Sequence, residues 1–153
     1  MTSRTARLIF AAPILASALA AQPPKSEEAV AFLKEAVAYY KAHGRAEALR
    51  EFTLPSGKFR RLGGELYITV YDQTGKCLAH GQEPAKVGLD ALHSKDPDGK
   101  LIIQERITLA RVHGKGWQEV KYRNPKSGVA EPKAMYYELH EGLVFATGIY
   151  KKG

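Results

Sequence analysis

Seven side chains in this sequence have types that suit the recognition of a small polar ligand. They combine a histidine, a lysine, a tryptophan and several hydroxyl groups: Tyr67, Thr69, Tyr71, His80, Trp117, Tyr122 and Lys133. A lysine that faces an enclosed pocket provides a point charge for a carboxylate. A histidine donates a hydrogen bond and carries a positive charge when protonated. Together these residue types are compatible with a binding site for a small polar ligand.

Most of these residues also have a purely structural interpretation. His80 ends a predicted strand, so it could hydrogen-bond the following loop instead of a ligand. Lys133 follows a proline and would only be solvated on an exposed face. Tyr67 and Tyr71 could be ordinary core or rim aromatics, and Trp117 could plug an edge of a sheet. The residue types alone leave both interpretations open.

Catalysis and metal binding find little support in the sequence. It contains no serine nucleophile elbow, no HExxH helix, no P-loop and no dinucleotide fingerprint. Cys77 is the only cysteine, so no internal disulfide, structural zinc site or covalent haem is indicated. Residues 96–99 have the start of a calcium loop, but the later ligands and the closing glutamate are missing. We therefore expect no enzyme activity, no cofactor and no metal.

The charge pattern bears on the class of partner. The net charge of +7 comes from 23 basic and 16 acidic residues. The basic residues are interspersed with acidic ones, as in the stretch from residue 28 to residue 51. A protein that binds nucleic acid more often concentrates its basic residues on one face or element. We expect no nucleic-acid partner.

The first 20 residues have the features of a secretory signal peptide. Arg4 and Arg7 precede an uncharged, mostly apolar run over residues 8–19, and residues 18–20 (Ala-Leu-Ala) fit the cleavage rule. The run is shorter than the roughly 20 residues that span a bilayer. An uncleaved membrane anchor is the alternative. We expect a periplasmic or secreted protein in which residues 21–153 form a single ligand-binding domain.

A predicted β-hairpin would position several of the candidates. Residues 66–71 alternate in polarity, a polar turn follows at 72–75, and a second short strand covers 76–79. Because side chains alternate along a strand, Tyr67, Thr69 and Tyr71 share one face. His80 ends the second strand.

The remaining elements complete a predicted α+β fold. Apolar spacing predicts helices over residues 26–44, 45–52 and 100–113, although a strand is an alternative for the third. Strands are predicted over 117–123, 133–139 and 143–150; Tyr122 is the weakest candidate because alternation in its strand is poorly defined. This order gives a PAS-like antiparallel sheet of about five strands, with the long N-terminal helix on one face. Residues 80–114 can cover the other face and enclose a cavity.

Short motifs along the chain also occur, in the same order, in one known family. They include Ala38-Tyr39-Tyr40-Lys41, Leu66-Tyr67, Leu78-Ala79-His80, Asp96-Pro97-Asp98-Gly99-Lys100, Gly114-Lys115-Gly116-Trp117, Asn124-Pro125, Glu131-Pro132-Lys133 and Gly148-Ile149-Tyr150-Lys151. The chain resembles the single Cache domain of the second type, the extracellular sensor module of bacterial chemoreceptors and kinases, in a free-standing exported form.

The resemblance implies a non-catalytic sensor that binds a small organic acid, with Lys133 as the anchor for the carboxylate. It also implies a membrane receptor or kinase as partner, unless the domain presents or sequesters its ligand. The chain departs from the family at Gly81, Leu101, Val120 and Tyr122, where a proline, two aromatic residues and a tryptophan are usual. These departures imply a ligand that differs from the family's usual small carboxylates.

A periplasmic interaction or accessory subunit is the second hypothesis. Such a protein would use the PAS-like scaffold without a ligand. Polar groups that converge on an enclosed cavity favour the sensor, whereas a pocket filled by apolar side chains favours the accessory subunit.

Overall fold

The computed structural model describes residues 25–151. The predicted signal peptide lies outside this range. No helix within residues 25–151 is long and apolar enough to cross a membrane.

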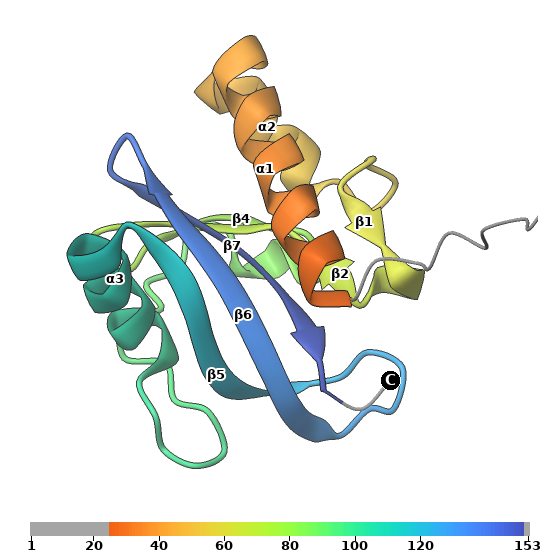
Figure 1. The fold of residues 1–153 in the computed structure, drawn as a ribbon, viewed down its shortest axis with the longest axis vertical. Coiled ribbons are helices and arrows are strands. Elements are labelled where there is room, and N and C mark those ends of the chain that lie inside the picture. The colour runs from red at the N-terminus through yellow and green to blue at the C-terminus, as the bar shows by residue number, and fades with distance from the viewer. Residues whose placement is uncertain (1–24, 152–153) are drawn as a thin grey trace, which may run out of the picture.

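A five-stranded antiparallel sheet forms the centre of the domain (Figure 1). Its strands, in the spatial order β4-β3-β7-β6-β5, are β4 Cys77–His80, β3 Thr69–Asp72, β7 Leu143–Tyr150, β6 Ala130–His140 and β5 Lys115–Arg123. A second sheet pairs β1 (Arg60–Arg61) with β2 (Leu66–Tyr67). Sequential hairpins connect β3 to β4, β5 to β6 and β6 to β7. The remaining pair, β3 with β7, closes the sheet between segments far apart in sequence.

Helix α1 (Lys25–His43) packs across one face of the sheet, with α2 (Arg45–Thr53) beside it. The helix is amphipathic, and Phe32, Leu33 and Val37 on its apolar face are buried with Phe145 of β7. Gly44 joins the two helices with φ of 83°, a conformation that glycine adopts without strain. This layer is a closed apolar core.

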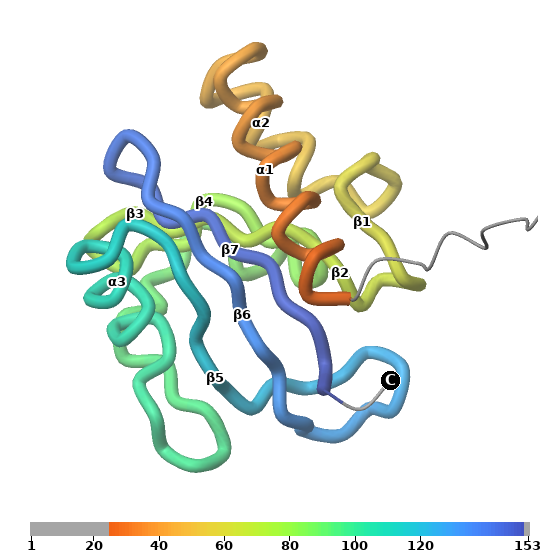
Figure 2. The backbone as a smooth tube through the Cα atoms, in the orientation of Figure 1, coloured from red at the N-terminus to blue at the C-terminus, as the bar shows by residue number. Residues whose placement is uncertain are grey.

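The opposite face is covered by α3 (Ile102–His113) and by residues 81–101, which include the short helix η2 (Pro84–Lys86). Ile103, Ile107 and Ala110 of α3 form a second core with Val144 and Ala146 of β7. Figure 2 shows the path of residues 81–101, in green, from β4 to α3. The five-stranded sheet therefore separates two layers. The layer under α1 is apolar, and the layer under α3 is more polar.

Asp96 fastens this covering segment to the sheet. Its Oδ1 accepts hydrogen bonds from the backbone N–H groups of Asp98 and Lys100, both at 3.0 Å. Its Oδ2 accepts one from the N–H of Lys121 on β5, at 3.2 Å. The turn predicted at residues 96–99 is therefore held to a strand by one carboxylate that bonds backbone amides.

The predicted α+β, PAS-like fold is confirmed, including the helix of the third region and the long helix on one face. Strand β7 has the predicted bounds, whereas β5 and β6 are longer than predicted. The first predicted hairpin strand is divided, because it leaves the small sheet after Tyr67 and joins the large one at Thr69. Ser26 lies in the first turn of α1 instead of at its cap; helix ends commonly shift by a residue or two.

Gly148 is a position where the sheet has no room for a side chain. A Cβ there would lie 2.8 Å from the carbonyl oxygen of Ala134 and 3.0 Å from Cε of Lys133, and closer still to Sδ of Met135. We expect Gly148→Ala to lower the free energy of unfolding by about 1–3 kcal/mol, as overpacking does. Urea unfolding measures this change.

A double-mutant cycle separates the clash from other effects of the substitution. In a Met135→Ala background the nearest atom is gone, so Gly148→Ala should cost less than it does in the wild type. The same cost in both backgrounds would contradict overpacking against Met135.

Candidate ligand-binding site

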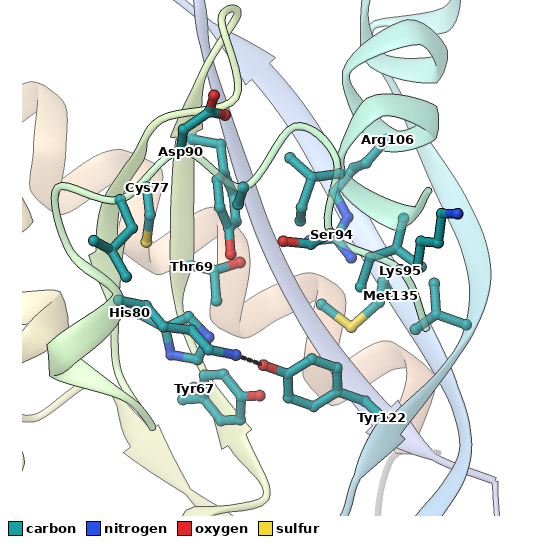
Figure 3. A pocket seen from close by; sticks show the side chains of 17 residues that line it. Tyr67, Thr69, Cys77, His80, Asp90, Ser94, Lys95, Arg106, Tyr122 and Met135 are labelled. Carbon is teal, nitrogen blue, oxygen red and sulfur yellow. Dashed lines mark hydrogen bonds between the residues drawn. The ribbon is translucent and has the colours of Figure 1, made fainter. Parts of the chain in front are cut away.

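A cavity of about 420 Å³ lies between the sheet and the layer formed by α3 and residues 81–101. Five of the seven predicted site residues line it: Tyr67, Thr69, Tyr71, His80 and Tyr122. Figure 3 shows Tyr67, Thr69 and His80 on the strand side of the cavity and Arg106 on the helix side. The cavity that the sequence predicted is present.

Alternation along the chain places the hairpin residues. Leu66, Ile68 and Val70 belong to the core under α1, so the side chains between them point the other way. Tyr67 and Thr69 consequently face the cavity although they lie in different sheets. Thr69 is fixed by a hydrogen bond from Oγ1 to the carbonyl oxygen of Ala146, at 3.3 Å.

His80 is buried and has a defined hydrogen-bonding role. Its Nδ1 accepts hydrogen bonds from the backbone N–H of Gln82 at 3.3 Å and of Glu83 at 2.9 Å. The neutral ring therefore carries its proton on Nε2, which lies 3.8 Å from Oε2 of Glu83. Burial, and then the positive charge of Lys86, lower the pKa of His80 to about 4. His80 both lines the cavity and organises the following loop, so the two interpretations of the sequence are compatible.

Lys133 is buried, 1% exposed, directly behind Tyr67. Its Nζ donates a hydrogen bond to the hydroxyl of Tyr67 at 3.3 Å and lies 4.3 Å and 4.6 Å from the ring centres of Tyr67 and Tyr150. Burial is the main cause that lowers the pKa of Lys133 to about 7; the charge of Arg106 adds to it and Glu65 opposes it. Lys133 does not itself line the cavity, but Tyr67, to which it donates, does.

Trp117 lies on the other face of the sheet. Its ring is 5.2 Å from that of Tyr136, and it borders a shallow depression with Val30 and Lys34 of α1. The indole is 40% exposed. Alternation along β5 explains the placement, because Tyr122 faces the cavity and Trp117 is five residues away on the opposite side. The structure does not bring Trp117 together with the other candidates.

Arg106 is a cavity residue that the sequence reasoning missed. It is 4% exposed, on the inner face of α3. Its Nε donates to Oε1 of Gln118 at 2.9 Å, and within residues 25–151 its guanidinium forms no ion pair and no other hydrogen bond between side chains. Burial lowers the pKa of Arg106, yet a guanidinium stays charged in proteins. The sequence feature that could have identified Arg106 is its position as a charged residue within the apolar stripe of Ile103, Ile107 and Ala110.

Three side chains close the cavity toward a neighbouring hollow. The hydroxyl of Tyr122 donates to Oε2 of Glu83 at 2.7 Å, and Nζ of Lys86 contacts the same oxygen at 2.6 Å and the Tyr122 hydroxyl. This group ties η2 to β5, and its members also border the second hollow with Lys121 and Arg123. Burial and the hydrogen bond to Glu83 raise the pKa of Tyr122, so its hydroxyl remains a donor at neutral pH.

Comparison with known families identifies the domain. Residues 35–151 match the profile of the family described as single Cache domain 2. The chain belongs to this family. The resemblance seen in the sequence is therefore confirmed, and the domain is of the extracytoplasmic ligand-sensing class.

Relatives of the domain occur in signalling proteins. The chain is 29% identical to the methyl-accepting chemotaxis protein McpP of Pseudomonas putida over 139 residues, which covers 85% of this chain and 25% of that receptor. The chain thus spans a quarter of the length of this relative. Its name identifies this relative as a chemotaxis receptor.

Two solved structures have the same fold. A methyl-accepting chemotaxis protein from Vibrio parahaemolyticus has a TM-score of 0.72 with 22% identity, covering 84% of this chain and 89% of that one. A structure presented as the basis for carboxylic acid recognition by a Cache chemosensory domain has a TM-score of 0.69 with 22% identity, covering 84% and 94%. The chain and these two structures therefore share one fold.

The pKa of His80 predicts how stability responds to acid. The unfolded imidazole takes up a proton near pH 6.5, whereas the folded one resists until about pH 4, so the folded state loses stability as the pH falls through this window. We expect the free energy of unfolding to fall by roughly 1–2 kcal/mol between pH 6.5 and pH 5. Urea unfolding at several pH values measures it.

His80→Gln should flatten this part of the pH profile. The matched control is His93→Gln, on an exposed part of the covering segment, which should leave the profile unchanged. A profile that is equally steep in the wild type and in His80→Gln would assign the effect to another group.

Proposed function

We propose that this domain senses small organic acids outside the cytoplasm and binds their carboxylate in the cavity beneath α3. The observation that carries the proposal is Arg106, a buried cation on the cavity wall that forms no ion pair with the residues described. A buried charge is costly unless it is paired, and a carboxylate is the partner that matches the planar guanidinium. A bound acid would supply the missing counter-charge.

Lys133 and Tyr67 add a second contact for the anion. Because Nζ of Lys133 donates to the hydroxyl oxygen of Tyr67, the Tyr67 proton is free to point into the cavity. The ammonium also strengthens this hydroxyl as a donor. In the proposed site Arg106 binds the carboxylate from the helix side and Tyr67 from the strand side. Lys133 thus acts through Tyr67 rather than by direct contact.

The rest of the wall favours a monocarboxylate without an amino group. Among residues 25–151, Asp90 is the only carboxylate that lines the cavity, and its Oδ1 accepts the N–H of Leu92 at 2.9 Å. The ammonium of an amino acid would have this single carboxylate as its counter-charge, whereas a monocarboxylate needs no acidic partner. Ile102, Val120 and Met135 offer an apolar surface for a short hydrocarbon body. Recognition of a carboxylic acid by one structural relative agrees with this chemistry.

The polar wall also bears on the alternative of an accessory subunit without a ligand. That hypothesis requires a pocket filled by apolar side chains, whereas buried polar groups such as His80, Thr69 and Arg106 converge here. We further propose that residues 1–20 are a cleaved signal peptide, that residues 21–153 form the exported domain, and that a membrane receptor or kinase receives its signal.

Three matched compounds test the ligand class. Propionate, propionamide and L-alanine are similar in size but differ in charge. Propionate is an anion, propionamide is neutral, and L-alanine is a zwitterion. We expect propionate alone to raise the melting temperature, because a ligand that binds only the folded state stabilises it, by about 2.7 kcal/mol at 100 times its Kd. Thermal shift and calorimetric titration measure this. Equal shifts with propionamide would contradict the anion site.

The same titration tests Arg106. Arg106→Gln should abolish propionate binding, because it removes the charge that the carboxylate neutralises. Arg111→Gln is the matched control on the same helix, since Arg111 is exposed and bonds Gln73 away from the cavity. If Arg106→Gln binds propionate as well as the control does, the proposed site is wrong.

Lys133 predicts a pH dependence of binding. Its pKa is about 7 in the free protein, and a bound anion raises it, so binding above pH 7 requires uptake of a proton. Propionate stays ionised throughout this range. We expect Kd to be constant below pH 7 and to rise by up to about tenfold per pH unit above it.

Lys133→Met should bind propionate more weakly and without this pH dependence. Lys115→Met, on an exposed end of β5, is the control and should keep the wild-type profile. A pH profile of Kd that is the same in Lys133→Met and in the control would exclude Lys133 as the titrating group.

A further inference from the structure

Gln118 lies beside Arg106 and outside the set of residues that line the cavity. It is a buried residue of β5, 3% exposed, and its side chain reaches from the sheet to the first turns of α3. Three hydrogen bonds are formed there: Oε1 accepts from Nε of Arg106 at 2.9 Å, and Nε2 donates to the carbonyl oxygen of Ile102 at 2.9 Å and to Oε1 of Glu105 at 3.0 Å.

These partners fix the orientation of the amide. The carbonyl of Ile102 and the carboxylate of Glu105 are both acceptors, so the NH₂ group of Gln118 must face them. The carbonyl oxygen of Gln118 is then left facing Arg106. A rotated amide would lose all three hydrogen bonds at a buried position. Gln118 consequently binds the guanidinium at Nε. Both terminal nitrogens of Arg106 remain available to a ligand.

The amide also keeps a carboxylate away from the guanidinium. Glu105 precedes Arg106 in the chain, and its Oε1 is engaged by Gln118 and lies 3.5 Å from Nζ of Lys100. A carboxylate that paired with Arg106 would satisfy the guanidinium and cancel its charge. Gln118 offers Arg106 a single uncharged acceptor oxygen, and its NH₂ group holds Glu105 on the other side.

We infer that Gln118 is a positioning residue that aims Arg106 at the cavity and prevents Glu105 from neutralising it. The inference rests on the proposed carboxylate site. In this arrangement a neutral amide sets the direction of the guanidinium, and the positive charge stays available for an incoming anion. Selectivity for an anionic ligand therefore depends on a residue that does not touch the ligand.

Propionate titrations of two variants test the inference. Gln118→Leu removes the acceptor and releases Glu105, and we expect Kd for propionate to rise at least tenfold. Gln118→Leu/Glu105→Gln lacks the competing carboxylate, and we expect it to regain at least threefold of the loss. A Kd within twofold of the wild type in Gln118→Leu, or a double variant no better than the single one, overturns the inference.

A second measurement does not depend on the ligand. In the free wild-type protein the Nε–H of Arg106 is buried and hydrogen-bonded, so its NMR signal should exchange slowly with water. In Gln118→Leu the signal should exchange at least tenfold faster, while the backbone amides of α3 keep their protection. An Arg106 signal that stays equally protected overturns the inference; Gln118→Met replaces Gln118→Leu if the latter does not fold.

The two measurements separate this inference from the proposed function. If propionate fails to bind the wild type, the carboxylate proposal fails, and the exchange rate of the Arg106 Nε–H still decides whether Gln118 positions the guanidinium. If propionate binds and Arg106→Gln abolishes binding, the proposed site stands, and the behaviour of the Gln118 variants alone decides the inference.

Discussion

The constraint on which the rest of this structure depends is the burial of two basic groups, the Arg106 guanidinium and the Lys133 amine, which form no ion pair within residues 25–151. Removing such a charge from water costs several kcal/mol even in a relaxed protein. Arg106 meets this cost with the neutral amide of Gln118, and Lys133 with a tyrosine hydroxyl and two aromatic rings. Neither set of contacts contains a negative charge, so the electrostatic potential near the cavity remains positive. A fold selected for stability alone has little reason to retain that potential, whereas a fold that binds an anion requires it.

The other elements can be understood as the means of holding these cations in place. The apolar stripe of α3 anchors the helix on the sheet, so that Arg106 points inward between Ile103 and Ile107. The absence of a side chain at Gly148 leaves space for the stem of Lys133. Asp96 ties the covering segment to β5, and Glu83, Lys86 and Tyr122 complete the wall. Apart from the ion pair of Glu83 with Lys86, these contacts join segments that are separated in sequence.

This distance explains which parts could be predicted from the sequence. Alternation is a local property, and it correctly placed Tyr67 and Thr69 on one face. The turn at Glu141-Gly142 is also local, and it marked the start of β7. Trp117 was predicted at the site but lies on the opposite face, because in β5 polar and apolar residues do not alternate clearly enough to identify the inner face from the sequence. Arg106 was not predicted as a site residue, because the apolar spacing that identifies its helix gives no role to the charged residue among the apolar ones. A charge within such a stripe is itself a signal, and the partners of Lys133 come from strands that only the fold brings together.

The division of neighbouring residues between two layers has a consequence for how such a domain diversifies. Leu66 and Ile68 belong to the core under α1, while Tyr67 between them faces the cavity. A substitution at Leu66 or Ile68 alters the packing against α1 and leaves the lining of the cavity largely intact. A substitution at Tyr67 alters the lining of the cavity and leaves the packing against α1 largely intact. The packing of the helical layer and the lining of the cavity can therefore change independently within the same three residues.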